Sequence, residues 1–509
     1  MRRIQKTPAI IMVLLALALI GWLLWQKNRN NEAPAVISQS NGQGQIAATR
    51  YCQSCHLLPD PTLLDKKTWR SFLPEMGWYL GIRTPGVTAI EPSEQDFFPA
   101  HPALSEKEWE DILAYYTAAA PEALPALPPA NLAPVQGFSP LPPPDFLFRP
   151  NVMASLVKID ASGKKPRLFV FDAYSSQLFL FDQDGLQDSL HLPGILTDLV
   201  ADGKQLYALS IGDQLQMGAD SYRQGSVLPI VVSTGGRMQL QKPLFTGLAR
   251  PVKLRKTETN GDGQPDFLVC EFGKLTGALC LLESQPKNYT RRVIRALPGA
   301  VNAFFEKNPE TGHQDIWALF AQGDESVLRL TLNADGSYQE EKVLRFPPSY
   351  GSSSFDMADL NGDGLKDILY TCGDNGDATQ ILKPYHGVYV YLQDEKGGFR
   401  QSYFHPMYGA YKVVAGDFLK KGRVDLAAIA YFTDPSRPQE WFVYLENKGQ
   451  GQFAASAAPE GFNLEAALTM DAGDFNGDGQ PDLLIGNAFL KNDPRQSAPL
   501  FGLMESITR

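Results

Sequence analysis

The 509-residue sequence predicts a multidomain fold with three parts: an N-terminal transmembrane helix, a small all-α domain and a large all-β domain of seven repeated units. Three observations lead to this prediction. An uncharged apolar run occupies residues 8–25. Helical patterns then fill residues 45–120. From residue 151 onward, short β-type runs recur at intervals of roughly 50 residues, which indicates a repeat architecture.

The apolar run of residues 8–25 has basic residues on both sides. In a helix it would reach roughly 27 Å at about 1.5 Å per residue, enough to cross the hydrocarbon core of a bilayer. A cleaved signal peptide is the alternative, with a late A-x-A site at residues 33–35. We expect a signal anchor over residues 1–30 and a flexible tether over residues 31–44. The remainder is then periplasmic, or otherwise extracytoplasmic, and anchored at the inner membrane.

Composition excludes two classes of protein. The net charge of −10 and the sequence pI of about 5.3 give no basic surface for nucleic acid. Five cysteines are too few for a disulfide-rich scaffold. Cys270 and Cys280 lie in successive predicted strands, so a disulfide between them and two small buried residues are both open interpretations.

The stretch Cys52-Gln53-Ser54-Cys55-His56 has the pattern C-x-x-C-H, the attachment signature of a c-type haem. Each thiol can form a thioether with a haem vinyl group, and the adjacent histidine can then ligate the iron. A redox-active cysteine pair does not need His56, and no second C-x-x-C or H-x-x-x-H motif completes a zinc site. We predict one covalent haem c, attached through Cys52 and Cys55, with His56 as the proximal iron ligand.

Met76 is the predicted distal iron ligand. It lies in the stretch Leu-Pro-Glu-Met-Gly of residues 73–77. A thioether ligand would raise the reduction potential relative to a second histidine. A buried core methionine is the alternative reading of Met76, and His101 is the other candidate ligand.

A well-marked helix closes this region. Ser105 and Glu108 form an S-x-x-E capping box, and Trp109, Ile112 and Tyr116 then lie on one apolar stripe. Together, C-x-x-C-H, L-P-x-M-G and this W-x-x-I-x-x-Y-Y helix resemble a small class I monohaem cytochrome c over residues 45–120. The resemblance implies electron transfer through a His/Met-ligated haem.

Residues 121–150 contain ten prolines. Such a segment cannot hold a helix and favours stiff, extended conformations. We expect it to be a semi-rigid linker between two domains.

Three acidic loops with one shared spacing follow, each leading into an apolar run. Oxygen-bearing side chains at loop positions 1, 3, 5 and 9 can surround one hard cation, and glycines at positions 4 and 6 permit the tight backbone path. A turn stabilised by its own Asx hydrogen bonds is the alternative. We predict up to three Ca²⁺ ions, with these ligands: Glu258, Asn260, Asp262, Asp266, Asp359, Asn361, Asp363, Asp367, Asp474, Asn476, Asp478 and Asp482.

Degenerate copies of the loop extend the repeat. Asp417 and Asp425 occupy positions 1 and 9 of one copy, but Leu419 and Lys421 stand at positions 3 and 5, so we expect that loop to bind no cation. A strand repeat of roughly 50 residues is typical of a propeller, which leaves few exposed sheet edges. The motif resembles the FG-GAP/VCBS repeat, which implies an all-β seven-bladed β-propeller over residues 151–509.

The whole chain is similar to bacterial membrane-anchored VCBS-repeat proteins with an N-terminal cytochrome c domain. We therefore expect a membrane-anchored periplasmic c-type cytochrome with an unknown redox donor and acceptor. Its calcium-binding propeller would bind a carbohydrate or protein ligand. The alternatives are a quinoprotein-like dehydrogenase and a calcium-dependent adhesion or carbohydrate-binding protein. No acid–base constellation repeats along the chain, so no catalytic residue is predicted.

Overall fold

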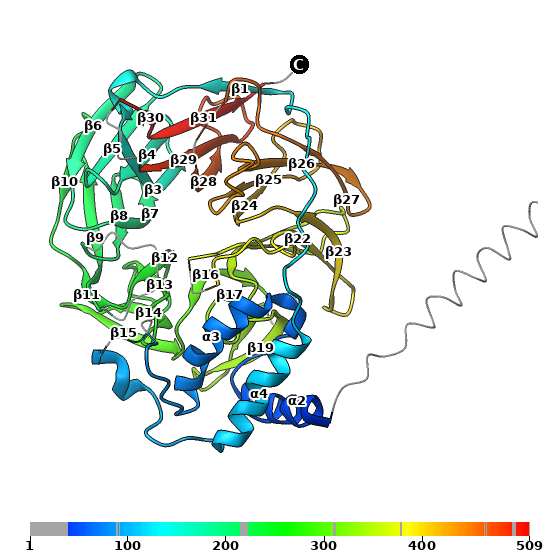
Figure 1. Ribbon diagram of the computed structural model, residues 1–509. Coiled ribbons are helices and arrows are strands. Elements are labelled where there is room, and N and C mark those ends of the chain that lie inside the picture. Colours follow the sequence, from blue (N-terminus) through cyan, green and yellow to red (C-terminus); the bar gives the residue numbers. More distant parts are fainter. Residues whose placement is uncertain are drawn as a thin grey trace, which may run out of the picture.

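The computed structural model describes residues 39–507, except 88–89, 91, 214–221, 309–311, 377–378, 463, 465 and 491–494. Antiparallel sheets surround one axis as the blades of a β-propeller, and short helices lie against one side of it (Figure 1). The expectation of a β-propeller is confirmed.

The strands of the described residues form seven blades. Six blades follow one another in chain order. Blade 1 consists of β3 (Asn151–Asp160), β4 (Arg167–Asp172), β5 (Gln177–Asp182) and β6 (Gly185–His191); blade 2 of β7 (Leu196–Asp202), β8 (Gln205–Ser210), β9 (Gly225–Val232) and β10 (Met238–Leu240), with β11 (Phe245–Leu248) on β9; and blade 3 of β12 (Pro251–Thr257), β13 (Asp266–Glu271), β14 (Ala278–Ser284) and β15 (Tyr289–Arg295). Blade 4 consists of β16 (Ala300–Lys307), β17 (Gln314–Phe320), β18 (Ser326–Leu332) and β19 (Tyr338–Arg345); blade 5 of β20 (Ser352–Ala358), β21 (Asp367–Cys372), β22 (Gly387–Gln393) and β23 (Phe399–Pro406); and blade 6 of β24 (Ala410–Gly416), β25 (Asp425–Ala430), β26 (Phe442–Gly449) and β27 (Gln452–Ser456). A two-strand pair, β2 (Phe148–Arg149) and β30 (Ala498–Pro499), lies beside them.

The seventh blade joins the two ends of the propeller. It consists of β28 (Ala467–Gly473), β29 (Asp482–Leu490), β31 (Phe501–Ser506) and, as its outer strand, β1 (Phe138–Leu141). The end of β29 also pairs with the start of β3 in blade 1. A strand that precedes the first blade therefore completes the last one, which protects a sheet edge that would otherwise be exposed.

In the part of the chain that the structure describes, three short α-helices precede the propeller: α2 (Gln39–Tyr51), α3 (Lys66–Tyr79) and α4 (Glu106–Ala119). The predicted capping box at the start of α4 is confirmed: the Ser105 N–H donates to Glu108 Oε2 at 2.9 Å, and the Glu108 N–H donates to Ser105 Oγ at 3.3 Å. The helices bury a small apolar core that includes Leu64, Trp69 and Ile112.

The predicted fold class is wrong in its helical part. The helices have only 13, 14 and 14 residues, and they pack on the propeller instead of forming a separate all-α cytochrome c domain. Ile381 of the propeller packs against the helical core, and Leu275 packs against Trp78. A helical segment of this size buries little apolar surface by itself. Packing on the propeller therefore adds to its stability.

The predicted transmembrane helix is not seen either. Within the part of the chain that the structure describes, no helix is long and apolar enough to cross a bilayer. Residues 8–25, on which that prediction rested, lie outside this part.

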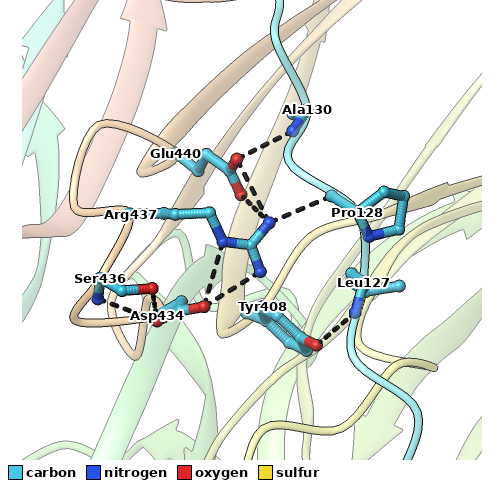
Figure 2. A network of polar contacts seen from close by, with 8 residues as sticks. All are labelled: Leu127, Pro128, Ala130, Tyr408, Asp434, Ser436, Arg437 and Glu440. Carbon is cyan, nitrogen blue, oxygen red and sulfur yellow. Dashed lines mark hydrogen bonds and ion pairs between the residues drawn. The ribbon is translucent and has the colours of Figure 1, made fainter.

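The proline-rich segment is fixed along the propeller instead of standing free. The Leu127 N–H donates to Tyr408 Oη at 2.7 Å, and the Ala130 N–H donates to Glu440 Oε1 at 2.9 Å (Figure 2). Arg437 donates to the Pro128 carbonyl at 3.0 Å. We call residues 127–141 the strap, because they follow blade 6 and then enter blade 7 as β1 (Figure 1).

Cys270 and Cys280 are free thiols. Cys270 lies opposite Leu279 in the ladder, and Cys280 lies opposite Val269. The two cysteines are thus one register position apart, so their side chains point to opposite faces of the sheet. Each is buried in a different apolar cluster, which rules out a disulfide in this conformation.

Candidate functional site

The C-x-x-C-H segment lies where α2 ends. Residues Cys52–Ser54 form one 3₁₀ turn that follows the helix directly. Both Cys52 and Cys55 are free thiols; Cys52 is half-buried and Cys55 is exposed. The turn is stabilised locally, since Ser54 Oγ donates to the Tyr51 carbonyl at 2.6 Å. Two free thiols therefore lie within four residues at the end of α2, and the Cys55 thiol is open to solvent. Burial raises the pKa of Cys52 to about 11.

His56 follows this turn with one ring nitrogen already engaged. Its Nδ1 lies 2.7 Å from the Leu57 carbonyl oxygen. With the proton on Nδ1, this hydrogen bond fixes the ring and leaves Nε2 as the metal-binding atom. Burial lowers the pKa of His56, and the Arg345 guanidinium acts in the same direction against Asp324 and the Leu57 carbonyl. The ring is thus held in the neutral form that ligates metals.

The resemblance to class I cytochromes implies that the L-P-x-M-G stretch is a loop. Met76 instead lies in the last turn of helix α3. Trp69, Leu73 and Gly77 form the buried side of this helix. Met76 is half-buried, four residues after Phe72 and so on the same face. Phe72 and Cys52 both pack against the apolar core of the helices. Helix α3 therefore places Met76 beside a residue that packs on the same core as Cys52.

The chemistry of this donor set suits haem c. Two unpaired thiols at the required spacing and a neutral histidine with an oriented ring are all present. His101, the alternative distal ligand, is exposed in the segment between α3 and α4.

The acidic loop of residues 359–367 shows how the repeated motif is built. Asp359 accepts the Gly362 N–H at 2.7 Å and the Gly364 N–H at 2.9 Å. Asn361 Oδ1 accepts the Asp363 N–H at 3.0 Å. Both glycines have positive φ, 81° and 85°, a conformation that disfavours residues with a Cβ. Positions 1, 3 and 5 of the loop thus surround one tight, exposed turn.

The other two loops have closely similar geometry. Asp474 accepts the Gly477 N–H at 2.7 Å and the Gly479 N–H at 2.9 Å. In the first loop the Glu258 carboxylate accepts the Gly261 N–H at 2.6 Å. Asn260, Asp262, Asn476 and Asp478 occupy the places of Asn361 and Asp363, and their Oδ1 atoms also accept backbone N–H groups.

Position 9 of the loop has a different role from the one that the spacing suggested. Asp367 is fully buried, and its two oxygens accept the Leu360 and Gln393 N–H groups, each at 2.9 Å. The first bond closes the loop, and the second joins it to the end of β22, the third strand of the blade. Asp266 and Asp482 are fully buried and bonded in the same way. The ninth residue therefore closes the blade from within.

The degenerate loop supports this assignment. Asp425 is fully buried and accepts the Asn447 N–H at 2.7 Å, although its loop lacks oxygens at positions 3 and 5. Lys421 of that loop points to Glu446 at 2.6 Å. A position-9 aspartate is thus kept where the other predicted ligands are missing. The sequence already indicated this structural role, because Asp425 occupies position 9 of a loop that was not expected to bind a cation.

Among the residues that the structure describes, no three His, Cys, Asp or Glu side chains are close enough to hold a metal ion together. The oxygens that remain at the exposed turn are those of positions 1, 3 and 5, two carboxylates and one amide in the loop of residues 359–367. This smaller donor set suits a hard cation that retains water ligands.

Two segments of the chain match known repeat families. Residues 310–370 match an FG-GAP-like repeat, and residues 467–497 match an FG-GAP repeat. The chain therefore contains FG-GAP repeats. Neither match covers residues 39–120, so the resemblance of that region to class I cytochromes gains no support here. No curated protein matches the sequence.

Solved structures with a similar fold include lyases and other propellers. A catalytically inactive virginiamycin B lyase from Staphylococcus aureus is 10% identical, with a TM-score of 0.43 over 72% of this chain and 98% of that one. An ancestral GH74 enzyme is 12% identical, with a TM-score of 0.47 over 71% and 49% of the two chains. The Dos1 propeller is 10% identical, with a TM-score of 0.40 over 69% and 80%. At such values these likenesses carry no argument about activity.

Proposed function

We propose that this protein is an extracytoplasmic electron-transfer protein whose helical segment holds one covalent haem c beside a binding propeller. The observation that carries the proposal is the turn of Cys52 and Cys55, followed by a neutral His56 whose Nδ1 is hydrogen-bonded. When bound there, haem supplies one-electron redox chemistry. Attachment adds each S–H across a vinyl double bond, so two C–S bonds form and no atom leaves.

The protein's own residues would set the properties of that group. His56 would ligate the iron through Nε2, with the Leu57 carbonyl holding the ring in place. Met76 is our proposed second ligand, presented from α3, and His101 is its competitor. Because such haems are attached outside the cytoplasm, residues 8–25 would direct export, to the periplasm in a two-membrane bacterium.

We further propose that the three acidic loops each bind one Ca²⁺ through positions 1, 3 and 5. The observation that favours this is the exposed arrangement of carboxylate and amide oxygens around each turn. The bound ions would stiffen the outer ends of three hairpins. The propeller itself would dock an unidentified partner, either the redox partner or a carbohydrate or protein ligand.

Covalent haem can be tested by acid–acetone extraction of protein made in a host that matures cytochromes c. The wild-type protein should keep its absorbance, and the variant with Cys52→Ser and Cys55→Ser should lose it. Cys372→Ser, in a fully buried propeller thiol, is the matched control and should retain the absorbance. Haem that extracts freely from the wild-type protein would show that the motif is not an attachment site.

A further inference from the structure

The innermost strands of the blades surround the axis of the propeller (Figure 1), and several of these strands carry charged residues. Several of these strands contain a β-bulge, and a polar residue follows the bulge directly. These residues are Asp198, Lys253, Asn302 and Lys412. Side chains two residues apart share a strand face. The inner strands of blades 1, 5 and 7 have the same bulge, just before Leu156, Ser354 and Thr469. We call the charged residues directly after these bulges, or two residues further along the strand, the axial charge cluster: Lys158, Asp198, Lys253, Arg255, Asp356, Lys412 and Asp471.

Two ion pairs between neighbouring blades neutralise part of the cluster. Lys158 of blade 1 lies 3.0 Å from Asp471 of blade 7. Lys253 of blade 3 lies 3.0 Å from Asp198 of blade 2. Both aspartates also accept a backbone N–H from the adjacent blade, at 2.9 Å in each case. These four residues therefore have a structural role that needs no ligand.

The remaining charges are not balanced in this way. Arg255 donates to neutral partners, the Ala303 carbonyl at 3.1 Å and Asn302 Oδ1 at 3.4 Å. Lys412 forms no hydrogen bond or ion pair with any residue that the structure describes. Asp356 accepts a single hydrogen bond there, from the Met357 N–H at 2.8 Å. The cluster thus holds four cations and three carboxylates, in a chain whose overall charge is −10.

An unbalanced cation at this place is costly. Lys412 is half-buried in an inner strand, where water screens charge poorly. Burial lowers the pKa of Lys412, and the positive charges of Lys158 and Arg255 act in the same direction. The carboxylates of Asp471 and Asp198 oppose this effect but are each engaged with another lysine. A bound anion would offset this repulsion.

We infer that the axis of the propeller binds a small oxyanion, either a carboxylate or a phosphate, with Lys412 as its principal ligand and Arg255 across the axis as the second cation. Asp356 sets the strength of the site, because its carboxylate competes with the anion for the same cations. This site is independent of the haem and of the acidic loops.

Isothermal titration of the full chain with inorganic phosphate, and separately with succinate, tests the inference and tells the two anion sources apart. Ionic strength is kept constant with chloride, so that general screening does not change. At least one of the two anions should bind saturably at about one per chain. Lys412→Met should weaken binding about tenfold or more, whereas Asp356→Asn should strengthen it several-fold.

Lys421→Met is the matched control, because Lys421 lies on the outside of the same blade and pairs with Glu446. It should leave anion binding unchanged. Circular dichroism checks that Lys412→Met is folded, and since Lys412 lacks a partner we expect no loss of thermal stability. Saturable binding of neither anion, or equal binding by Lys412→Met and the wild-type protein, would overturn the inference.

Discussion

Two histidines of blade 5 are held as neutral rings. His386 is 1% exposed, and neither ring nitrogen has a hydrogen-bond partner among the described residues. Burial and the Lys383 ammonium keep the pKa of His386 well below its usual range. His405 is half-buried, and burial lowers its pKa to about 4. Both residues therefore resist a proton that the unfolded chain would accept.

This difference predicts that the protein loses stability in mild acid. The unfolded chain takes up a proton on each histidine near pH 6.5, but folded His405 does so only near pH 4. The contribution of each neutral histidine to the free energy of unfolding is complete above about pH 6.5. It is lost as the pH falls toward 4, at about 1.4 kcal/mol per pH unit for each histidine.

Urea unfolding between pH 7 and pH 5 measures this dependence. His386→Gln and His405→Gln should each flatten the curve, and the double variant should flatten it most. His191→Gln, at an exposed position of blade 1, is the control and should leave the slope unchanged. Equal slopes in the wild-type protein, both single variants and the double variant would show that these rings do not govern acid stability.

At the scale of the element, the acidic hairpin combines two separate functions in nine residues. Its ninth residue is a buried acceptor for backbone N–H groups, and its first, third and fifth residues form an exposed turn. In one and the same loop, Asp367 is the buried acceptor and Asp363 belongs to the exposed turn. Substituting them separately therefore distinguishes blade closure from cation binding.

Asp367→Ala should destabilise the protein by about 2–4 kcal/mol whether or not calcium is present, because two buried N–H groups lose their acceptor. Asp363→Ala should cost less than about 1 kcal/mol without calcium, since the residue is exposed. It should also remove one site's share of the calcium effect, about 2.7 kcal/mol at a hundredfold excess over Kd.

Melting curves with millimolar calcium and with chelator measure both effects. Asp425→Ala, in the loop that carries Lys421, should destabilise the protein without changing its response to calcium. If the chelator leaves the wild-type melting curve unchanged and metal analysis finds no calcium, the turns are stabilised by their own hydrogen bonds alone.

For the whole molecule, the strap connects the helical segment, blade 6 and blade 7. Arg437 is the centre of this connection, since it holds the Pro128 carbonyl and pairs with Asp434 at 3.0 Å and Glu440 at 3.2 Å (Figure 2). The helical segment contacts the propeller separately, through Glu94 with Lys274 at 2.6 Å. The helices and propeller should therefore behave as one body.

Limited proteolysis tests this arrangement. Residues 127–137 of the strap should resist cleavage in the wild-type protein, although their sequence resembles an open linker. Tyr408→Phe removes the hydrogen bond to Leu127 and Arg437→Met removes the bond to Pro128, so both should speed cleavage there, with about 1 kcal/mol lost for Tyr408→Phe. Arg223→Met, which loses a bond to the Gly247 carbonyl within blade 2, should not. Rapid cleavage in the wild-type protein would mean that the strap is free.

The sequence by itself determined the features that depend on neighbouring residues. The recurring aspartates that start β13, β21, β25 and β29 indicated a propeller of repeated blades, and the spacing of Ser105 and Glu108 marked the start of α4. Turn chemistry and helix capping involve residues within one or two turns of each other, so their spacing is visible in the chain.

Only the tertiary structure decided what distant residues do together. Helix α3 carries Met76 although its motif suggested a loop, because the buried positions of this helix pack against neighbouring helices. The position-9 aspartates turn into the blade because the N–H groups of another strand lie there. The axial charge cluster draws its residues from several inner strands that are far apart in sequence. Such contacts arise from the closure of the ring, which no local spacing records.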